Sequence, residues 1–185
     1  SFYGLGDKTG FLDKRGYEYV MWNTDDPDPQ VDNFKSLYKS IPFFITLRKD
    51  AVFGLFFDNP YRSCFDMGKE SDDYYWYGVS DGNLDYYLIA GDSMAEVLGN
   101  YTYLTGTAPL PQKWTLGYHQ SRWSYMSEEE IRDVAKRMRE CGVPCDVIHL
   151  DIDYMDGFRV FTWNKDRYDS PGKMMEDLAK DGFKI

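Results

Sequence analysis

Hydrophobic and polar positions follow two different patterns along the chain, and the pattern changes near residue 108. Before that point, short apolar and aromatic runs alternate with polar turns, as is typical of antiparallel β-structure. The strands that these runs predict are 17–22, 43–47, 52–57, 74–77 and 84–89. Residues 48–51 separate two of them and indicate a hairpin. We therefore expect residues 1–107 to form the later strands of an antiparallel β-sandwich.

A helix and a stiff link close this first region. Ser93 and Glu96 form a capping-box pattern, after which apolar residues recur at helical spacing as far as Gly106. The Asp/Pro-rich segment 25–29 cannot be a central strand, because proline lacks the backbone N–H that a sheet needs. The link 108–111 contains two prolines, does not favour a helix, and marks the expected domain boundary.

From residue 108 onward, the chain alternates short apolar runs with amphipathic helices in the order β-α-β-α-β. The predicted strands are 114–118 and 143–150, the predicted helices begin at Ser127 and Ser170, and residues 182–185 begin a third strand. The near-continuous apolar run is typical of a strand buried on both faces of a parallel sheet. With right-handed crossovers, residues 108–185 predict the first two units of a (β/α)8 TIM barrel.

The composition and charge of the chain make some classes of binding partner less favourable than others. The 185 residues carry a formal net charge of −10, which disfavours nucleic acids and anionic membranes because like charges repel. No apolar run approaches the roughly 18 residues that span a bilayer. Aromatic residues make up 18% of the chain, which suits stacking on sugar faces as well as an ordinary β-rich core. We expect a neutral or cationic ligand, and the oligomeric state stays open.

The cysteines and the two ends of the chain bear on metal binding, on the cellular compartment and on whether the chain is part of a longer protein. Cys141 and Cys145 are spaced C-x3-C, which is not by itself a zinc-ligand pattern. We expect free thiols and neither a metal nor a cofactor. Because no signal peptide is visible, we expect a cytoplasmic protein. The chain lacks an initiator methionine and ends as an apolar run begins, so we expect it to be an excerpt of a longer protein.

Three candidate site residues follow directly after the predicted barrel strands. Active sites of β/α barrels lie at the C-terminal ends of their strands, where side chains from several strands converge. Trp123 comes shortly after the first predicted strand, and Asp151 and Asp153 come at the end of the second. The sequence therefore predicts a ligand site around these three side chains.

Four segments together resemble glycoside hydrolase family 31. They are YGLGDKTGFLDKRG at 3–16, MWNTD at 21–25, PLPQKWTLGYHQSRWSY at 109–125 and DVIHLDIDYMDG at 146–157. The resemblance covers essentially the whole chain and implies an N-terminal β-sandwich for residues 1–107 and the start of the catalytic barrel for residues 108–185. The DIDYMD form resembles the α-glucosidase branch of the family.

The resemblance implies retaining hydrolysis of α-glycosidic bonds by two aspartates, one a nucleophile and the other an acid/base. The nucleophile's W-x-D-M-N-E-like run and the acid/base region are absent from these 185 residues, so we expect no catalytic residue in this chain. The implied activity is removal of terminal glucose from maltose-like or isomaltose-like oligosaccharides. An α-xylosidase, an α-galactosidase and a non-catalytic carbohydrate-binding module are the alternatives.

The resemblance also implies four substrate-binding residues. Asp151 corresponds to the aspartate that hydrogen-bonds the glucose in the −1 subsite, and Ile152 to part of the apolar wall of that subsite. Trp123 falls at an aromatic position that lines the same pocket. Asp25 matches an acid on a sandwich loop that reaches toward the +1 sugar, although Thr24 replaces an arginine found in some relatives.

The pair Asp151 and Asp153 admits other interpretations. In a regular strand their side chains would project to one face, with Cα atoms about 6.6 Å apart. A self-contained catalytic pair is disfavoured, because the two acids must flank the scissile bond rather than approach it from one side. For Asp151 the alternative to sugar binding is a salt bridge with a neighbouring Arg or Lys. For Asp153, structural pairing and substrate contact are equally open.

The remaining candidates also have structural alternatives. Trp123 could belong to the core, as most tryptophans do. Asp25 could be a solvated turn residue, since Asp and Pro are common in turns. His119 directly follows the predicted strand 114–118, and His149 lies in the predicted strand 143–150. We interpret both as hydrogen-bonded structural residues.

Overall fold

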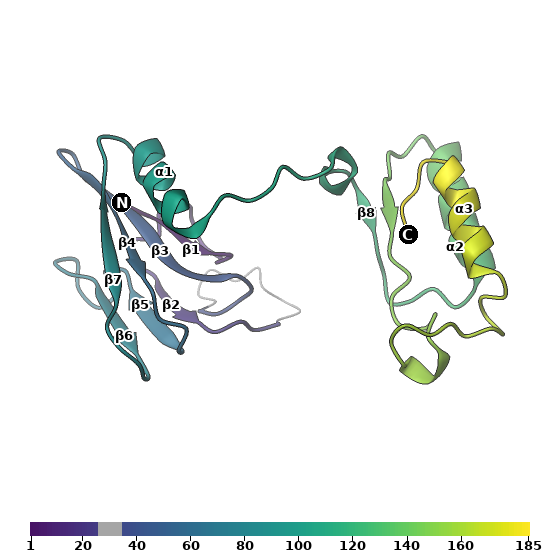
Figure 1. The fold of residues 1–185 in the computed structure, drawn as a ribbon, viewed down its shortest axis with the longest axis horizontal. Helices are drawn as coiled ribbons and strands as arrows, with labels where there is room; N and C mark the ends of the chain where they lie inside the picture. The colour runs from purple at the N-terminus through teal and green to yellow at the C-terminus, as the bar shows by residue number, and fades with distance from the viewer. Residues whose placement is uncertain (26–34) are drawn as a thin grey trace. The chain divides into compact units, whose positions relative to one another are not determined.

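The computed structural model describes residues 1–25 and 35–185, and it forms two compact units, Ser1–Ala108 and Pro109–Ile185 (Figure 1). From residue 26 onward, the proline-rich segment that was excluded from a central strand lies outside the described residues.

The first unit contains two antiparallel sheets. One sheet has the order β1-β3-β4-β7, and the other has the order β2-β5-β6 (Figure 1). The strands are β1 Phe2–Gly6, β2 Glu18–Met21, β3 Ser40–Leu47, β4 Val52–Phe57, β5 Ser63–Asp66, β6 Trp76–Val79 and β7 Tyr86–Ala90. Every neighbouring pair runs antiparallel, so the predicted antiparallel arrangement is confirmed.

The hairpin predicted at residues 48–51 is also confirmed. Leu47 pairs with Val52, and the backbone N–H of Arg48 donates to the carbonyl of Ala51 at 2.8 Å. Strands β1 and β5 were not predicted. In β1, glycines interrupt the alternation of apolar and polar residues that would indicate a strand. The register of its pairing with β3 shifts between Gly4 and Gly6, and both glycines have positive φ.

Aromatic side chains from both sheets fill the space between them. The buried cluster comprises Phe2, Leu5, Tyr19, Met21, Phe44, Phe57, Phe65 and Met67. The Phe44 and Phe65 rings, from different sheets, meet edge to face with centroids 6.0 Å apart. Part of the aromatic content of this unit therefore fills the core of a two-layer sandwich.

Helix α1, Met94–Thr105, packs on the other face of the four-stranded sheet. Its N-cap Ser93 accepts a hydrogen bond from the backbone N–H of Glu96 at 3.2 Å, as the capping pattern predicted. Val97 is fully buried in a second cluster with residues of the sheet, and the ring of Phe43 stacks on Tyr101 at 3.8 Å.

The second unit has the predicted β-α-β-α-β order. Its elements are β8 His119–Gln120, α2 Glu128–Glu140, β9 Val147–Ile148 and α3 Pro171–Lys180 (Figure 1). Strands β8 and β9 are parallel, and Val147 forms a further parallel bridge with Lys184. The parallel start of the sheet is thus confirmed, with strands much shorter than predicted.

Two strand predictions in this unit need correction. Residues 114–118 do not form a strand, because Lys113–Leu116 is a 3-10 helix in which the carbonyl of Gln112 accepts from the backbone N–H of Thr115 at 3.0 Å. Of the predicted strand 143–150, only Val147–Ile148 pairs in the sheet. Pro144 lacks a backbone donor, which disfavours pairing at the start of that run.

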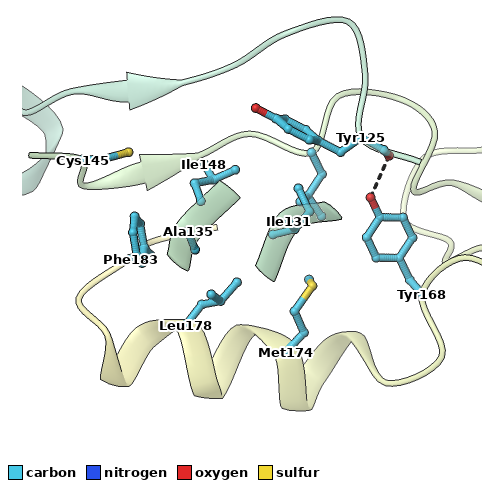
Figure 2. Packing of buried hydrophobic residues seen from close by; sticks show 10 residues of the cluster. Tyr125, Ile131, Ala135, Cys145, Ile148, Tyr168, Met174, Leu178 and Phe183 are labelled. Atoms are coloured by element: carbon cyan, nitrogen blue, oxygen red, sulfur yellow. Dashed lines mark hydrogen bonds between the residues drawn. The ribbon is translucent and has the colours of Figure 1, made fainter. Parts of the chain in front are cut away.

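The helices of the second unit cover one side of the short strands. Ile131 and Ala135 of α2 and Met174 and Leu178 of α3 meet Ile148 in one buried cluster (Figure 2). Both helices begin at the predicted caps Ser127 and Ser170, and Gly142 and Gly182 follow their ends with positive φ. Cys141, which follows the last residue of α2, is exposed. No helix in the described parts of the chain has the length and apolarity to cross a membrane.

A matched pair of glycine substitutions tests the packing of α1 on the sheet. A Cβ at Gly54 would lie 2.7 Å from Cε2 of Phe43 and 2.9 Å from Cγ1 of Val97. Gly54→Ala should therefore lower the free energy of unfolding by about 1–3 kcal/mol through overpacking. Gly99→Ala adds the same methyl within α1, where no atom of the described residues beyond the adjacent helix backbone lies within 4 Å, and should raise stability by about 0.5–1 kcal/mol. Urea unfolding of both variants measures this, and equal effects would contradict the described packing.

Candidate functional site

The chain turns sharply at Asp151, three residues beyond the end of β9. Asp151 has a positive φ of 63°, which ends any extended continuation of the strand. Its side chain is exposed, and no hydrogen bond or ion pair joins its carboxylate to another described residue. The salt bridge considered as its alternative role is therefore absent from the described part of the chain.

Asp153, in contrast, is held by an ion pair. It is only 8% exposed, and its Oδ1 accepts from Nη1 of Arg167 at 2.6 Å. The same Nη1 donates to the backbone carbonyl of Asp153 at 3.2 Å. The hydrogen bond from Arg167 holds the pKa of Asp153 below its usual value. Structural pairing is the role that the structure assigns to Asp153.

The two aspartates therefore do not project to one face, and that prediction is wrong. It assumed a regular strand through residue 153, whereas β9 ends at Ile148 and the backbone changes direction at Asp151. One carboxylate is left exposed and the other is turned inward against Arg167. A catalytic pair made of these two acids is excluded by the same geometry.

Asp151 and His149 line two open hollows at this end of the strands. Each hollow has a volume of about 440 Å³. The first is completed by Ser121 and Arg122, and the second by Leu150, Tyr154, Trp163, Met175 and Ile185. Polar and charged groups thus face one side of Asp151, and mainly apolar groups face the other.

Ile152 and Trp123 are both accessible. Ile152 is 42% exposed, and Trp123 is 89% exposed, so Trp123 does not belong to the hydrophobic core of its unit. Neither side chain lines the hollows around Asp151. The structure therefore brings Trp123, Asp151 and Ile152 to the strand ends of one unit without direct contact between Trp123 and the hollows.

The segment that carries Trp123 is anchored on both sides. Arg122 donates to the carbonyl of Ser124 at 3.0 Å and to Oε2 of Glu130 at 3.1 Å. Its guanidinium lies 4.4 Å from the centroid of the Tyr125 ring. The carbonyl of Tyr125 in turn accepts from the hydroxyl of Tyr168 at 2.8 Å (Figure 2).

Tyr168 is itself fully buried. Burial, followed by nearby acids such as Glu130, raises the pKa of Tyr168 to about 12. The hydroxyl therefore stays protonated and remains a donor at neutral pH. The turn after β8 is thereby tied to the segment that precedes α3.

Asp25 belongs to the first unit. It is exposed, and its carboxylate accepts a hydrogen bond from the hydroxyl of Tyr38. Thr24 is held by backbone contacts, since its N–H donates to the carbonyl of Leu37 at 3.1 Å and its hydroxyl to the carbonyl of Trp22 at 3.2 Å. Asp25 is therefore a partnered loop residue, and its role in sugar contact stays a prediction.

Sequence reasoning missed Arg122 and His149 as site residues. The prediction that the two histidines are hydrogen-bonded is confirmed, because Nδ1 of His119 and Nε2 of His149 are 3.2 Å apart. His149 also lines both hollows beside Asp151, which its place two residues before that aspartate could have indicated. Within residues 1–25 and 35–185, no group of three or more His, Cys, Asp or Glu could hold a metal ion.

Comparison with family models gives two matches. Residues 108–185 match the TIM-barrel domain of glycosyl hydrolases family 31. Residues 1–66 match the glycosyl hydrolase 31 N-terminal galactose mutarotase-like domain.

Several proteins with similar sequences are named α-glucosidase. Alpha-glucosidase 2 of Bacillus thermoamyloliquefaciens is 47% identical over 184 residues, which cover 100% of this chain and 23% of that protein. Neutral alpha-glucosidase AB of Homo sapiens is 33% identical over 191 residues, which cover 92% of this chain and 20% of that protein. The chain thus spans about a quarter of the length of the curated relatives it matches.

Solved structures resemble the chain over nearly its whole length. A Flavobacterium johnsoniae GH31 dextranase, complexed with isomaltotriose, is 41% identical with a TM-score of 0.86, and the match covers 98% of this chain and 22% of that chain. A family 31 alpha-glucosidase from Bacteroides thetaiotaomicron is 37% identical with a TM-score of 0.85, and the match covers 99% of this chain and 31% of that chain.

Asp153→Asn tests the inward-facing carboxylate. The amide cannot keep the ion pair with Arg167, so the melting temperature at about pH 7 should fall. Because the pKa of Asp153 is lowered on folding from its usual 3.8, its stabilisation is present above that value and is lost as the pH falls through the folded pKa. The difference in melting temperature from the unsubstituted chain should therefore shrink on acidification.

Asp151→Asn is the matched control for this prediction. It changes the same atoms two residues earlier, at a carboxylate with no partner among the described residues. Circular dichroism should show its melting temperature at about pH 7 close to that of the unsubstituted chain. Equal losses of stability in the two variants would contradict the assignment of Asp153 as the anchored member of the pair.

Proposed function

Because the chain belongs to glycoside hydrolase family 31, we propose that its protein is a retaining α-glucosidase that removes terminal non-reducing glucose from oligosaccharides. The relatives named α-glucosidase support the hydrolytic activity; two of them are 47% and 34% identical to this chain. The dextranase complexed with isomaltotriose supports an α-linked oligosaccharide as the substrate class. Maltose-like and isomaltose-like substrates both fit these relatives.

The observation that carries the proposal is the free carboxylate of Asp151. An exposed carboxylate offers strong acceptors for hydroxyl groups, and a charge-assisted hydrogen bond is about twice as strong as a neutral one. No described side chain occupies these acceptors, whereas the carboxylate of Asp153 is paired with Arg167. A glucose unit in the hollow would supply hydroxyl donors to Asp151.

The other predicted residues complete the proposed site. Ile152 would supply apolar surface to the −1 subsite, and the exposed ring of Trp123 would contact an apolar sugar face. Asp25 would approach the +1 sugar from the sandwich loop. We propose further that β8, α2, β9 and α3 are the first two units of a (β/α)8 barrel, whose later strands would enclose the open hollows.

The proposed chemistry needs two carboxylates that flank the scissile bond. Asp153 cannot serve as one of them, because its carboxylate is paired with Arg167 and turned inward. Asp151 would bind and orient the sugar through its hydroxyls. We propose that this chain supplies part of the binding shell, and that the nucleophile and the acid/base belong to other parts of the longer protein.

Asp151→Ala in the longer enzyme tests the proposal. Loss of hydrogen bonds to a charged group, worth about 1.5–3 kcal/mol, should lower kcat/KM for an aryl α-glucoside by about tenfold or more. Steady-state kinetics on aryl α-glucoside, α-xyloside and α-galactoside measure both the loss and the specificity. Unchanged kinetics would remove Asp151 from the site.

Isothermal titration calorimetry of the 185-residue chain with maltose distinguishes the proposed enzyme function from that of a carbohydrate-binding module. The hollows around Asp151 are open, and an incomplete pocket should bind sugar weakly. Tight binding by this chain alone would favour the module.

A further inference from the structure

The two histidines of the chain form a pair beside Asp151. They are its only histidines: His119 begins β8, and His149 directly follows β9, which pairs with β8 in parallel. The backbone N–H of His149 donates to the carbonyl of Gln120 at 2.9 Å, which brings the two strands into register there. Nδ1 of His119 then lies 3.2 Å from Nε2 of His149, with the rings 26° from parallel.

The two rings have different surroundings. The ring of His119 stacks on Trp114 with centroids 6.4 Å apart, and its Nε2 is buried without a hydrogen-bond partner among the described residues. His149 is exposed and lines both hollows that contain Asp151. One ring is therefore enclosed and the other can reach a ligand.

This arrangement favours one tautomer. A neutral imidazole carries a single N–H, and a hydrogen bond between two rings needs one donor and one acceptor. If His119 carried its proton on Nε2, that donor would be buried without an acceptor in the described structure, which is unfavourable. Its proton therefore belongs on Nδ1, which donates to Nε2 of His149. The proton of His149 must then be on Nδ1.

We propose that His119 is a positioning residue that holds His149 in the Nδ1–H tautomer, so that His149 offers a hydrogen-bond donor to a sugar hydroxyl in the hollows beside Asp151. The choice of ligand rests on the proposed function, whereas the tautomer does not. Asp151 is an acceptor and Nδ1–H of His149 is a donor, so the two together match a hydroxyl group, which both donates and accepts.

Nuclear magnetic resonance of the chain labelled with ¹⁵N in its two histidines tests the tautomer directly. Long-range ¹H–¹⁵N spectra distinguish a protonated ring nitrogen from a bare one. At about pH 8.5, where imidazole is ordinarily neutral, Nδ1 of both histidines should carry the proton. A proton on Nε2 of His149 would overturn the proposal.

His119→Phe tests the cause of the tautomer. Phenylalanine keeps a planar ring against Trp114 but removes the donor, so His149 should shift toward the Nε2–H form that free imidazole side chains prefer in water. Because His149 is the one histidine left in this variant, its spectrum also shows which signals of the unsubstituted chain belong to His149. An unchanged His149 tautomer would show that His119 does not set it. If this variant does not fold, the spectrum of the unsubstituted chain still decides the tautomer.

Kinetics of the longer enzyme test the contact with substrate. His149→Phe should raise KM for maltose about threefold to tenfold, the loss expected of one neutral hydrogen bond, with a smaller change in kcat. His149→Asn places an amide N–H near the position of Nδ1 and should restore most of the affinity. An unchanged KM in His149→Phe would overturn the contact, even with the tautomer as expected. Absence of glycosidase activity in the unsubstituted enzyme would instead contradict the proposed function and leave the tautomer result intact.

Discussion

The change of backbone direction at Asp151 is the constraint on which the candidate site depends. A left-handed conformation costs a residue other than glycine about 1–2 kcal/mol, and aspartate tolerates it better than most. Because φ is 63° at this residue, the chain leaves the path of β9 and the alternation of an extended strand is lost. As a result, the carboxylates of two aspartates that are two positions apart differ in exposure and in hydrogen-bond partners. The carboxylate of Asp151 is left without a partner among the described residues, and Asp153 becomes an anchor for the loop.

The anchor depends on residues that are distant in sequence. Arg167 reaches Asp153 across fourteen positions and contacts both its carboxylate and its carbonyl. Tyr168, the next residue, donates to the carbonyl of Tyr125 on the turn after β8. The segment before α3 therefore holds both loops that carry candidate site residues. Rigid support of this kind is what a binding site on loops requires, since loose side chains lose affinity and precision.

Donors and acceptors are arranged around Asp151 in a way that suits a polyhydroxyl ligand. One hollow combines Asp151 with Arg122 and His149, and the other adds the aromatic residues Tyr154 and Trp163. Sugar recognition generally needs polar groups for the hydroxyls and aromatic surface for the apolar face. Membership of glycoside hydrolase family 31 gives this arrangement its chemical context. The net charge of −10 is compatible with a neutral saccharide.

The sequence by itself determined the features that rest on local interactions. The caps Ser93 and Ser127, the helices after them and the hairpin at 48–51 depend on hydrogen bonds between residues a few positions apart, and each is confirmed. The tertiary structure alone decided the rest. Strand β5 is short and was not predicted, because its pairing with β2 and β6 is set by residues far away in sequence. The different orientations of Asp151 and Asp153, and the contact between His119 and His149, likewise follow from a backbone turn and from partners that only the folded chain brings within reach.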